Sequence, residues 1–256
     1  MSSLQTSLLI FGFIFGGAVC GVFLQPFLDE HHLNSDSKEI FSGARGVIVG
    51  LAALTLGLLV SSAKTSFDAK SDELKKQAAN LILLDRVLID YGPKANVART
   101  AVAHAIQEEI NQVRRANVEG ADVRSEIGAG RLEELRPTLL NLASSNERES
   151  WLKTTSLSLC QEIMASRWRI YEDLASDIQW PIVGVLVFWL CSIFFSFGVI
   201  TPRNVLAFGG LFVASASMAG AMFLILEMDE AYQGYITVSA APLETALQKV
   251  SRSTAQ

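Results

Sequence analysis

Residues 46–62 read GVIVGLAALTLGLLVSS, a run without a charged side chain. A helix rises about 1.5 Å per residue, so a run of this kind can cross a hydrocarbon core of about 30 Å. Three further apolar runs of similar length occur in the chain, at Ser7–Gln25, Pro181–Ile200 and Asn204–Leu226. The four runs predict an integral membrane protein whose helices lie in a lipid bilayer.

The stretch between the two pairs of runs is polar. It holds 16 of the 21 Lys and Arg residues and 18 of the 26 Asp and Glu residues. We therefore predict an all-α membrane protein with four transmembrane helices and a cytoplasmic helical bundle inserted between the second and third. The predicted parts are residues 1–63 (helices 1 and 2 with an external loop at 26–45), 64–179 (bundle), 180–228 (helices 3 and 4) and 229–256 (C-terminal tail).

Basic residues near the membrane ends predict the orientation of the chain. The bundle side carries the larger number, including Lys64, Lys70, Lys75, Lys76, Arg167, Arg169, Lys249 and Arg252, against Lys38, Arg45 and Arg203 on the other side. We expect both termini in the cytoplasm and a multi-pass protein of the inner (plasma) membrane. No Lys or Arg precedes the first run, so we interpret it as a retained transmembrane helix rather than a secretion signal.

The second membrane helix is predicted to continue into the bundle, because neither Gly nor Pro occurs between Leu58 and Tyr91. Gly92-Pro93 then ends it. Beyond the membrane its apolar residues recur at helical spacing and require a partner helix. These residues are Phe67, Leu74, Ala78, Leu81 and Leu88. Further bundle helices are predicted at 94–116, at 131–144 and from Ser145 or Asn146 towards the third membrane helix.

Small residues form ridges on the membrane helices. The first helix carries Gly12, Gly16, Gly17 and Gly21, and the second carries Gly46, Gly50, Ala53, Gly57 and Ser61 with Leu54 and Leu58 beside them. Such ridges allow helices to pack closely. On the second helix, the same face also suits the pore of a multi-subunit channel. We predict oligomerisation through this ridge and through the Phe67–Leu88 stripe.

Three carboxylates, Glu227, Asp229 and Glu230, lie where the fourth membrane helix ends. Negative charge is unfavourable at a helix C-terminus, so these groups require compensation. Lys64 or Lys70 of a neighbouring subunit, a bound divalent cation and simple solvation are the alternatives. No other metal site or cofactor is expected.

Residues for catalysis are scarce. The histidines His31, His32 and His104 lack metal-ligand spacing, and a polar external loop is the preferred interpretation of the first two over a metal or proton sensor. Adjacent carboxylates such as Glu108 and Glu109 point about 100° apart on a helix. A net charge of -5 without a long basic tract argues against nucleic acid as a partner. We therefore do not expect an enzyme.

Several segments together resemble the bestrophin-like bacterial membrane proteins. The most distinctive is Leu226–Ser239, LEMDEAYQGYITVS, followed by Pro242-Leu243. The other matches are Phe67-Asp68-x-Lys70, Leu84-Asp85-Arg86 with Tyr91-Gly92, and Thr201-Pro202-Arg203-Asn204. Ala231-Tyr232 stands where the group often has Pro-Phe, and Lys70 stands where Arg is usual.

A more distant similarity to bestrophins implies a function. Bestrophins are pentameric anion channels with four membrane helices per subunit, a pore lined by the second helix, and an acidic calcium-binding segment after the fourth in animal members. The resemblance implies a homo-oligomer, a pentamer, that conducts small anions along the small ridge. Gly50, Ala53 and Gly57 occupy the face where bestrophins have a bulky neck.

Cations at the membrane ends are candidates for charge selection, because a ring of them raises the local anion concentration. These candidates are Arg45, Arg203 and Lys64, and anchoring at the lipid headgroups is the alternative role. For the whole protein, the alternative is a non-conducting, membrane-anchored scaffold whose bundle binds a partner.

Overall fold

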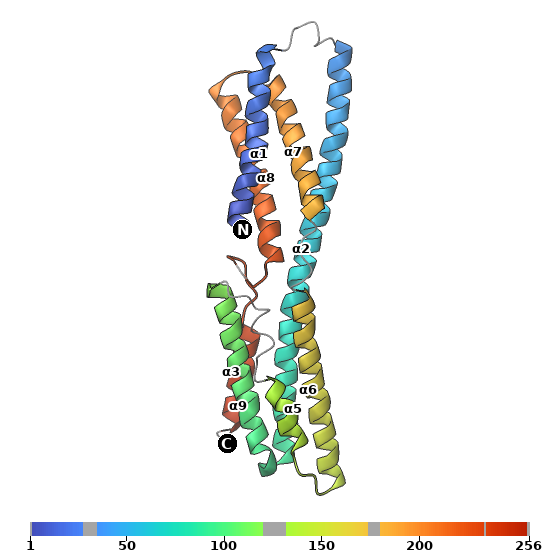
Figure 1. Cartoon of the computed structure of the whole chain (residues 1–256), viewed down its shortest axis with the longest axis vertical. Helices are drawn as coiled ribbons and strands as arrows, with labels where there is room; N and C mark the ends of the chain where they lie inside the picture. The colour runs from blue at the N-terminus through green and yellow to red at the C-terminus, as the bar shows by residue number, and fades with distance from the viewer. Residues whose placement is uncertain (1, 28–34, 120–131, 174–179, 233, 255–256) are drawn as a thin grey trace. The chain divides into compact units, whose positions relative to one another are not determined.

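The computed structural model describes residues 2–27, 35–119, 132–173, 180–232 and 234–254. Within these ranges the regular secondary structure is helical throughout, which confirms the predicted all-α class (Figure 1). The α-helices are α1 (Ser3–Leu24), α2 (Ser35–Tyr91), α3 (Asn96–Glu119), α5 (Leu132–Leu140), α6 (Glu147–Asp173), α7 (Trp180–Ile200), α8 (Val205–Asp229) and α9 (Ala241–Thr254). Two 3-10 turns, Gln25–Phe27 and Pro93–Ala95, follow α1 and α2.

The chain folds into two compact units. The membrane unit comprises Met1–Thr65 and Asp177–Asp229, and the bundle unit comprises Ser66–Ser176 and Glu230–Gln256. The four predicted runs lie on α1, α2, α7 and α8, each long and apolar enough to cross a membrane. Helix α2 is continuous over 57 residues and contributes to both units, as predicted from its lack of Gly and Pro after Leu58.

Two predicted boundaries differ from the structure. Helix α2 begins at Ser35, so the second half of the predicted external loop is helical. No proline interrupts this segment, so the chain can be helical from this point. The predicted tail is also not a separate part, because α9 belongs to the bundle unit. Its residues Leu243, Ala246 and Val250 recur at helical spacing and are buried there.

Two glycines allow α1 and α7 to approach closely. A Cβ atom placed on Gly21 would lie 2.2 Å from the carbonyl oxygen of Phe195, and one placed on Gly198 would lie 2.1 Å from that of Ala18. Gly17 also faces α7, whereas a Cβ on Gly12 or Gly16 would meet nothing within 4 Å. The predicted α1 ridge is therefore used for packing within the subunit over only part of its length.

Aromatic side chains join α1 to α8. Phe11 and Phe15 stack on α1 with ring centroids 5.6 Å apart. Both rings meet Phe212 of α8 edge-on, at 5.4 Å and 5.6 Å. Such edge-to-face contacts add to the burial of apolar area, so they help to fix α1 against α8.

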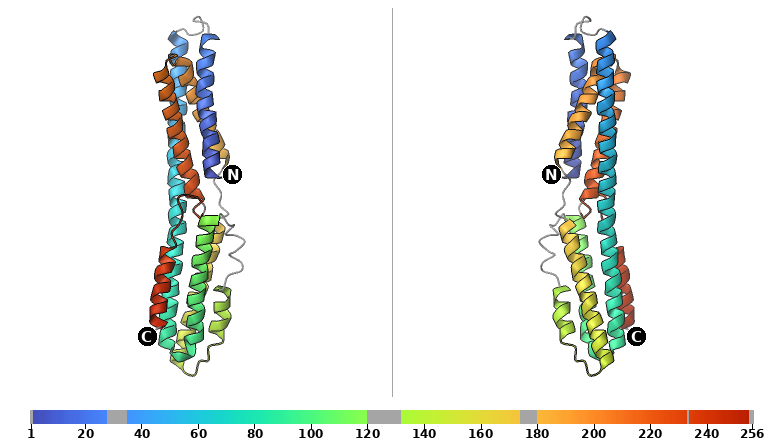
Figure 2. Two further views of the ribbon diagram at one scale, coloured as in Figure 1. Left: turned by 90° about the vertical axis from the view of Figure 1, so that its left-hand side faces the viewer. Right: turned by 90° about the vertical axis from the view of Figure 1, so that its right-hand side faces the viewer.

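The stripe on the second half of α2 is buried inside the bundle unit. Leu74, Ala78, Leu81 and Leu88 lie in its core, and Phe67 packs against that core. Helices α3, α5, α6 and α9 supply most of the other side chains, and α3 lies beside α5 and α9 (Figure 2). The stripe thus has its partners within the same chain. The sequence argument that it requires a second subunit was wrong, and the prediction of oligomerisation no longer rests on this stripe.

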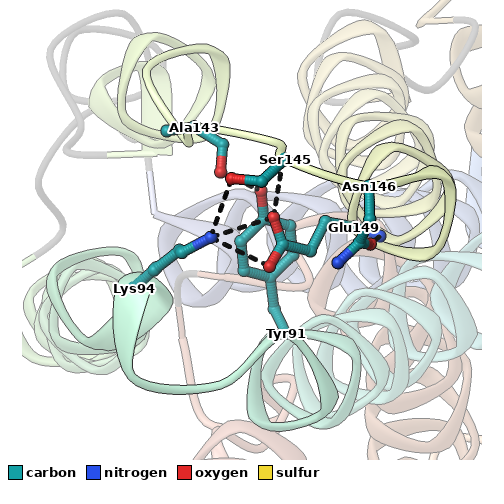
Figure 3. A network of polar contacts seen from close by, with 6 residues as sticks. All are labelled: Tyr91, Lys94, Ala143, Ser145, Asn146 and Glu149. Carbon is teal, nitrogen blue, oxygen red and sulfur yellow. Dashed lines mark hydrogen bonds and ion pairs between the residues drawn. The ribbon is translucent and has the colours of Figure 1, made fainter.

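A polar network joins the end of α2 to the start of α6 (Figure 3). The side chain of Lys94 donates to both carboxylate oxygens of Glu149, at 2.9 Å and 3.0 Å. The backbone N–H of Ser145 also donates to Glu149, at 2.7 Å, and the Tyr91 hydroxyl donates to the Ala143 carbonyl. Asn146 caps α6 by accepting from the Glu149 N–H, which confirms one of the two predicted helix starts.

We expect Glu149→Gln to reduce the stability of the bundle unit in a pH-dependent way. The Ser145 N–H and then Lys94 lower the pKa of Glu149. The folded state therefore gains its full stabilisation above the ordinary pKa of a glutamate and loses it as the pH falls through the lowered value. The measurement is the thermal midpoint of wild type and variant from neutral to acidic pH. The difference should be largest near neutrality and shrink in acid, and a difference that grows in acid would contradict the assignment.

Candidate functional site

The small ridge of α2 lies on the surface of the membrane unit. Gly46, Gly50, Ala53, Gly57 and Ser61 are all exposed. A Cβ placed on any of the three glycines would meet nothing within 4 Å. Leu54 and Leu58 beside the ridge are also exposed, at 64% and 63%. The opposite side of α2, with Ile48, Ala52 and Ala63, is the side that packs against the rest of the unit.

Helix α2 is much less covered by the rest of its own chain than the other membrane helices are. Of its most apolar stretch only 11% is buried, against 33%, 44% and 33% for α1, α7 and α8. Because most of this stretch makes no contact within its own chain, it can face lipid, a second subunit or water. Because the exposed ridge consists of small residues rather than bulky ones, it suits close helix contact or the wall of a pore.

Two of the three cations predicted to select charge make contacts within the membrane unit. The guanidinium of Arg45 lies 5.0 Å from the ring centroid of Phe197. The Arg203 side chain donates to the Val22 carbonyl at 3.1 Å. Both contacts hold the arginines near the end of the unit where α1 and α7 finish and α8 begins. Lys64, the third candidate, is exposed. Charge selection by these residues stays a prediction.

The three residues of the predicted acidic cluster lie in different surroundings. Glu227 is buried, and the hydroxyl of Ser3 on α1 donates to its carboxylate. Asp229 is half-buried and Glu230 is exposed. Among the described residues, no group of three or more His, Cys, Asp and Glu side chains is arranged to hold a metal. A cation bound by Glu227, Asp229 and Glu230 stays a prediction, and Ser3 is a partner that sequence reasoning missed.

Lys70 is buried, although its charge predicts an exposed position. We expected it at the membrane end of α2, available to compensate the acidic turn of a neighbouring subunit. Its side chain is 2% exposed in the structure. Lys70 precedes Leu74 by one helical turn and shares the buried stripe. Its position on the helix, rather than its charge, therefore decides where it lies.

The bundle unit contains buried ion pairs that the sequence did not reveal. Arg99 of α3 donates to Asp85 of α2 at 2.9 Å, and both side chains are nearly buried. Arg167 of α6 pairs with Glu109 of α3 at 3.2 Å. Burial raises the pKa of Glu109, and the neighbouring Arg167 opposes the rise. These pairs fix which faces of the helices meet, so we assign them to the architecture of the bundle.

The structure describes one of the three histidines considered in the sequence. His31 and His32 lie outside the described residues. His104 is exposed on α3. The free Cys160 is buried in the bundle core, and burial raises the pKa of its thiol, so it is a poor nucleophile.

Comparison with known proteins agrees with this architecture. A family model described as Bestrophin-like domain matches residues 12–243. A crystal structure of a mutated bacterial bestrophin homologue from Klebsiella pneumoniae has a TM-score of 0.70 at 12% identity, covering 100% of this chain and 99% of that chain. A second mutant has a TM-score of 0.67 at 13% identity, covering 97% and 99%. A search of curated proteins finds no match.

The two kinds of match carry different weight. At such low identity the solved structures show the fold alone, and the fold they show is that of a bestrophin. The family model extends over nearly the whole chain, from within α1 to the start of α9, and so includes all of α2, α7 and α8. The chain therefore belongs to the bestrophin-like family of membrane proteins.

Proposed function

We propose that the protein is a homo-oligomeric channel, a pentamer as in bestrophins, that conducts small anions along a pore lined by α2. The observation that carries the proposal is the exposed small ridge, Gly46, Gly50, Ala53, Gly57 and Ser61, on the least covered membrane helix. The bestrophin fold supports the same assignment of α2. A ridge without charge leaves room for a partly hydrated ion and offers no strong binding that would trap it.

Helix packing between subunits is the main competing role for the ridge, and thiol labelling distinguishes it from a pore. Cys20, Cys160 and Cys191 are first replaced to give a cysteine-free background. Gly50→Cys or Gly57→Cys is then introduced, with Gly184→Cys on α7 as the control. All three glycines are exposed and have no neighbour within 4 Å of a Cβ.

In a pore, a charged, water-soluble thiol reagent should modify the Gly50→Cys and Gly57→Cys variants and block their chloride flux in proteoliposomes. The reason is that a thiol reacts as the thiolate, which forms in water and not in lipid. The Gly184→Cys variant should keep its flux. Failure to modify both α2 variants in an intact oligomer would contradict the proposed pore and favour the scaffold.

We also expect Gly50→Leu to lower chloride flux strongly while the isolated subunit keeps its fold. The added side chain meets nothing within its own subunit. In an oligomer it would enter the pore or a close helix contact, where extra bulk is costly. Light scattering in detergent separates these cases, since a blocked pore keeps the oligomer mass and a disturbed interface does not. Unchanged flux and unchanged mass would remove the ridge from both roles.

A further inference from the structure

The membrane unit contains a cavity of about 420 Å³ between α1, α2 and α7. Apart from Arg45, its larger wall side chains are apolar: Ile48, Phe188, Ile193 and Phe195. The volume falls within the range of about 300–1,000 Å³ that is usual for small-molecule sites. The small ridge of α2 does not contribute to the wall, so this cavity is separate from the proposed pore surface.

Arg45 is the one charged residue of the cavity wall. Its guanidinium lies over the ring of Phe197, which turns the charge towards α7. Within the described ranges, no carboxylate forms an ion pair with Arg45. A positive charge at a membrane end attracts the anionic groups of lipid headgroups. The ring contact supplies no negative charge, so the guanidinium can still take an anionic partner.

Two serines of α7 also line the cavity and differ in their hydrogen bonds. Ser192 donates to the Phe188 carbonyl at 2.9 Å, one helical turn earlier. The hydroxyl of Ser196 is buried, and no described atom accepts from it. Its oxygen has almost no accessible surface, so Ser192 is the serine that a ligand in the cavity can contact.

We propose that this cavity binds one phospholipid, with an acyl chain among the apolar side chains and the phosphate at Arg45. An acyl chain fills apolar space that water occupies poorly. A phosphate matches the fork of a guanidinium and supplies the missing countercharge. The inference concerns lipid binding and does not depend on conduction.

Native mass spectrometry of delipidated protein titrated with phosphatidylglycerol tests the proposal. The wild type should retain one lipid per subunit, and Arg45→Gln should weaken retention about tenfold, since a charge-assisted contact is lost. Arg203→Gln is the matched control, because Arg203 contacts the Val22 carbonyl and does not line the cavity. A second variant, Ala44→Phe, adds bulk at an exposed position of the wall and should expel the acyl chain without loss of charge.

The outcomes separate the possible occupants. Loss of lipid in both Arg45→Gln and Ala44→Phe, with retention in Arg203→Gln, supports the proposal. Equal retention in all four proteins would overturn it. Displacement of the lipid by inorganic phosphate alone would also overturn it, because the cavity would then hold a free anion. Light scattering of the same samples reports whether a variant has lost its assembly, and lipid loss only in disassembled protein would overturn the proposal by assigning the cavity to a subunit contact.

Discussion

Replacing Gly198 with alanine is expected to destabilise the membrane unit by about 3 kcal/mol, at the upper end of overpacking costs. A Cβ at this position would lie 2.1 Å from the carbonyl oxygen of Ala18 and 3.0 Å from the backbone nitrogen of Val22. Both neighbours are backbone atoms of α1, so no side chain can move aside. The helices would have to separate, which would loosen the contacts of Ala18 and Val22 along the crossing.

The matched control is Gly184→Ala, on the same helix α7. A Cβ at Gly184 meets nothing within 4 Å, so this substitution adds one methyl group without a clash. Thermal unfolding of the detergent-solubilised proteins, followed by circular dichroism, compares the two. We expect a clear fall of the midpoint for Gly198→Ala and a value near wild type for Gly184→Ala. Equal midpoints would show that α1 and α7 do not cross at these glycines.

Asp85→Ala is expected to destabilise the bundle unit by about 3–5 kcal/mol, the usual cost of breaking a buried ion pair. The carboxylate lies 2.9 Å from the Arg99 Nε, and the two side chains are only 5% and 11% exposed. Removing the carboxylate leaves the guanidinium buried without its countercharge. The loss of stability therefore comes mainly from Arg99, the partner that remains buried.

Asp72→Ala provides the comparison, because it removes the same side chain from the same helix. Asp72 pairs with Lys75 at 2.8 Å, but its side chain is 72% exposed. A pair in this setting contributes about 1 kcal/mol or less. Denaturant unfolding of both variants should show a loss several times larger for Asp85→Ala. Similar losses would contradict the burial of the Asp85–Arg99 pair.

Local sequence signals predicted the helices and several of their ends. Helix α2 continues to Tyr91 because neither Gly nor Pro interrupts its second half. It ends at Gly92, whose φ of 92° lies in the left-handed region that favours glycine. Helix α6 begins after Asn146, a good N-cap residue. Each of these features depends on a few neighbouring residues, which is why the sequence was sufficient.

Contacts between segments that lie far apart in the sequence could not be predicted from it. Ser3 and Glu227 are 224 residues apart, and only the packing of α1 with α8 brings them together. The contact of Arg45 with Phe197 depends in the same way on α2 and α7. The burial of Lys70 follows from its helical register, which a prediction based on charge alone did not consider. The periodicity of the sequence thus predicted the candidate pore residues, but it did not predict which side chains of other helices surround them.

The most direct test of the proposed function is chloride flux in proteoliposomes that contain the purified oligomer. A salt gradient across the membrane gives the reversal potential, which reports whether anions or cations carry the current. We predict chloride-selective flux in the wild type and a strong reduction in Gly50→Leu. Flux no greater than that of protein-free liposomes, from an oligomer of intact mass and correct fold, would contradict the assignment of this protein as an anion channel.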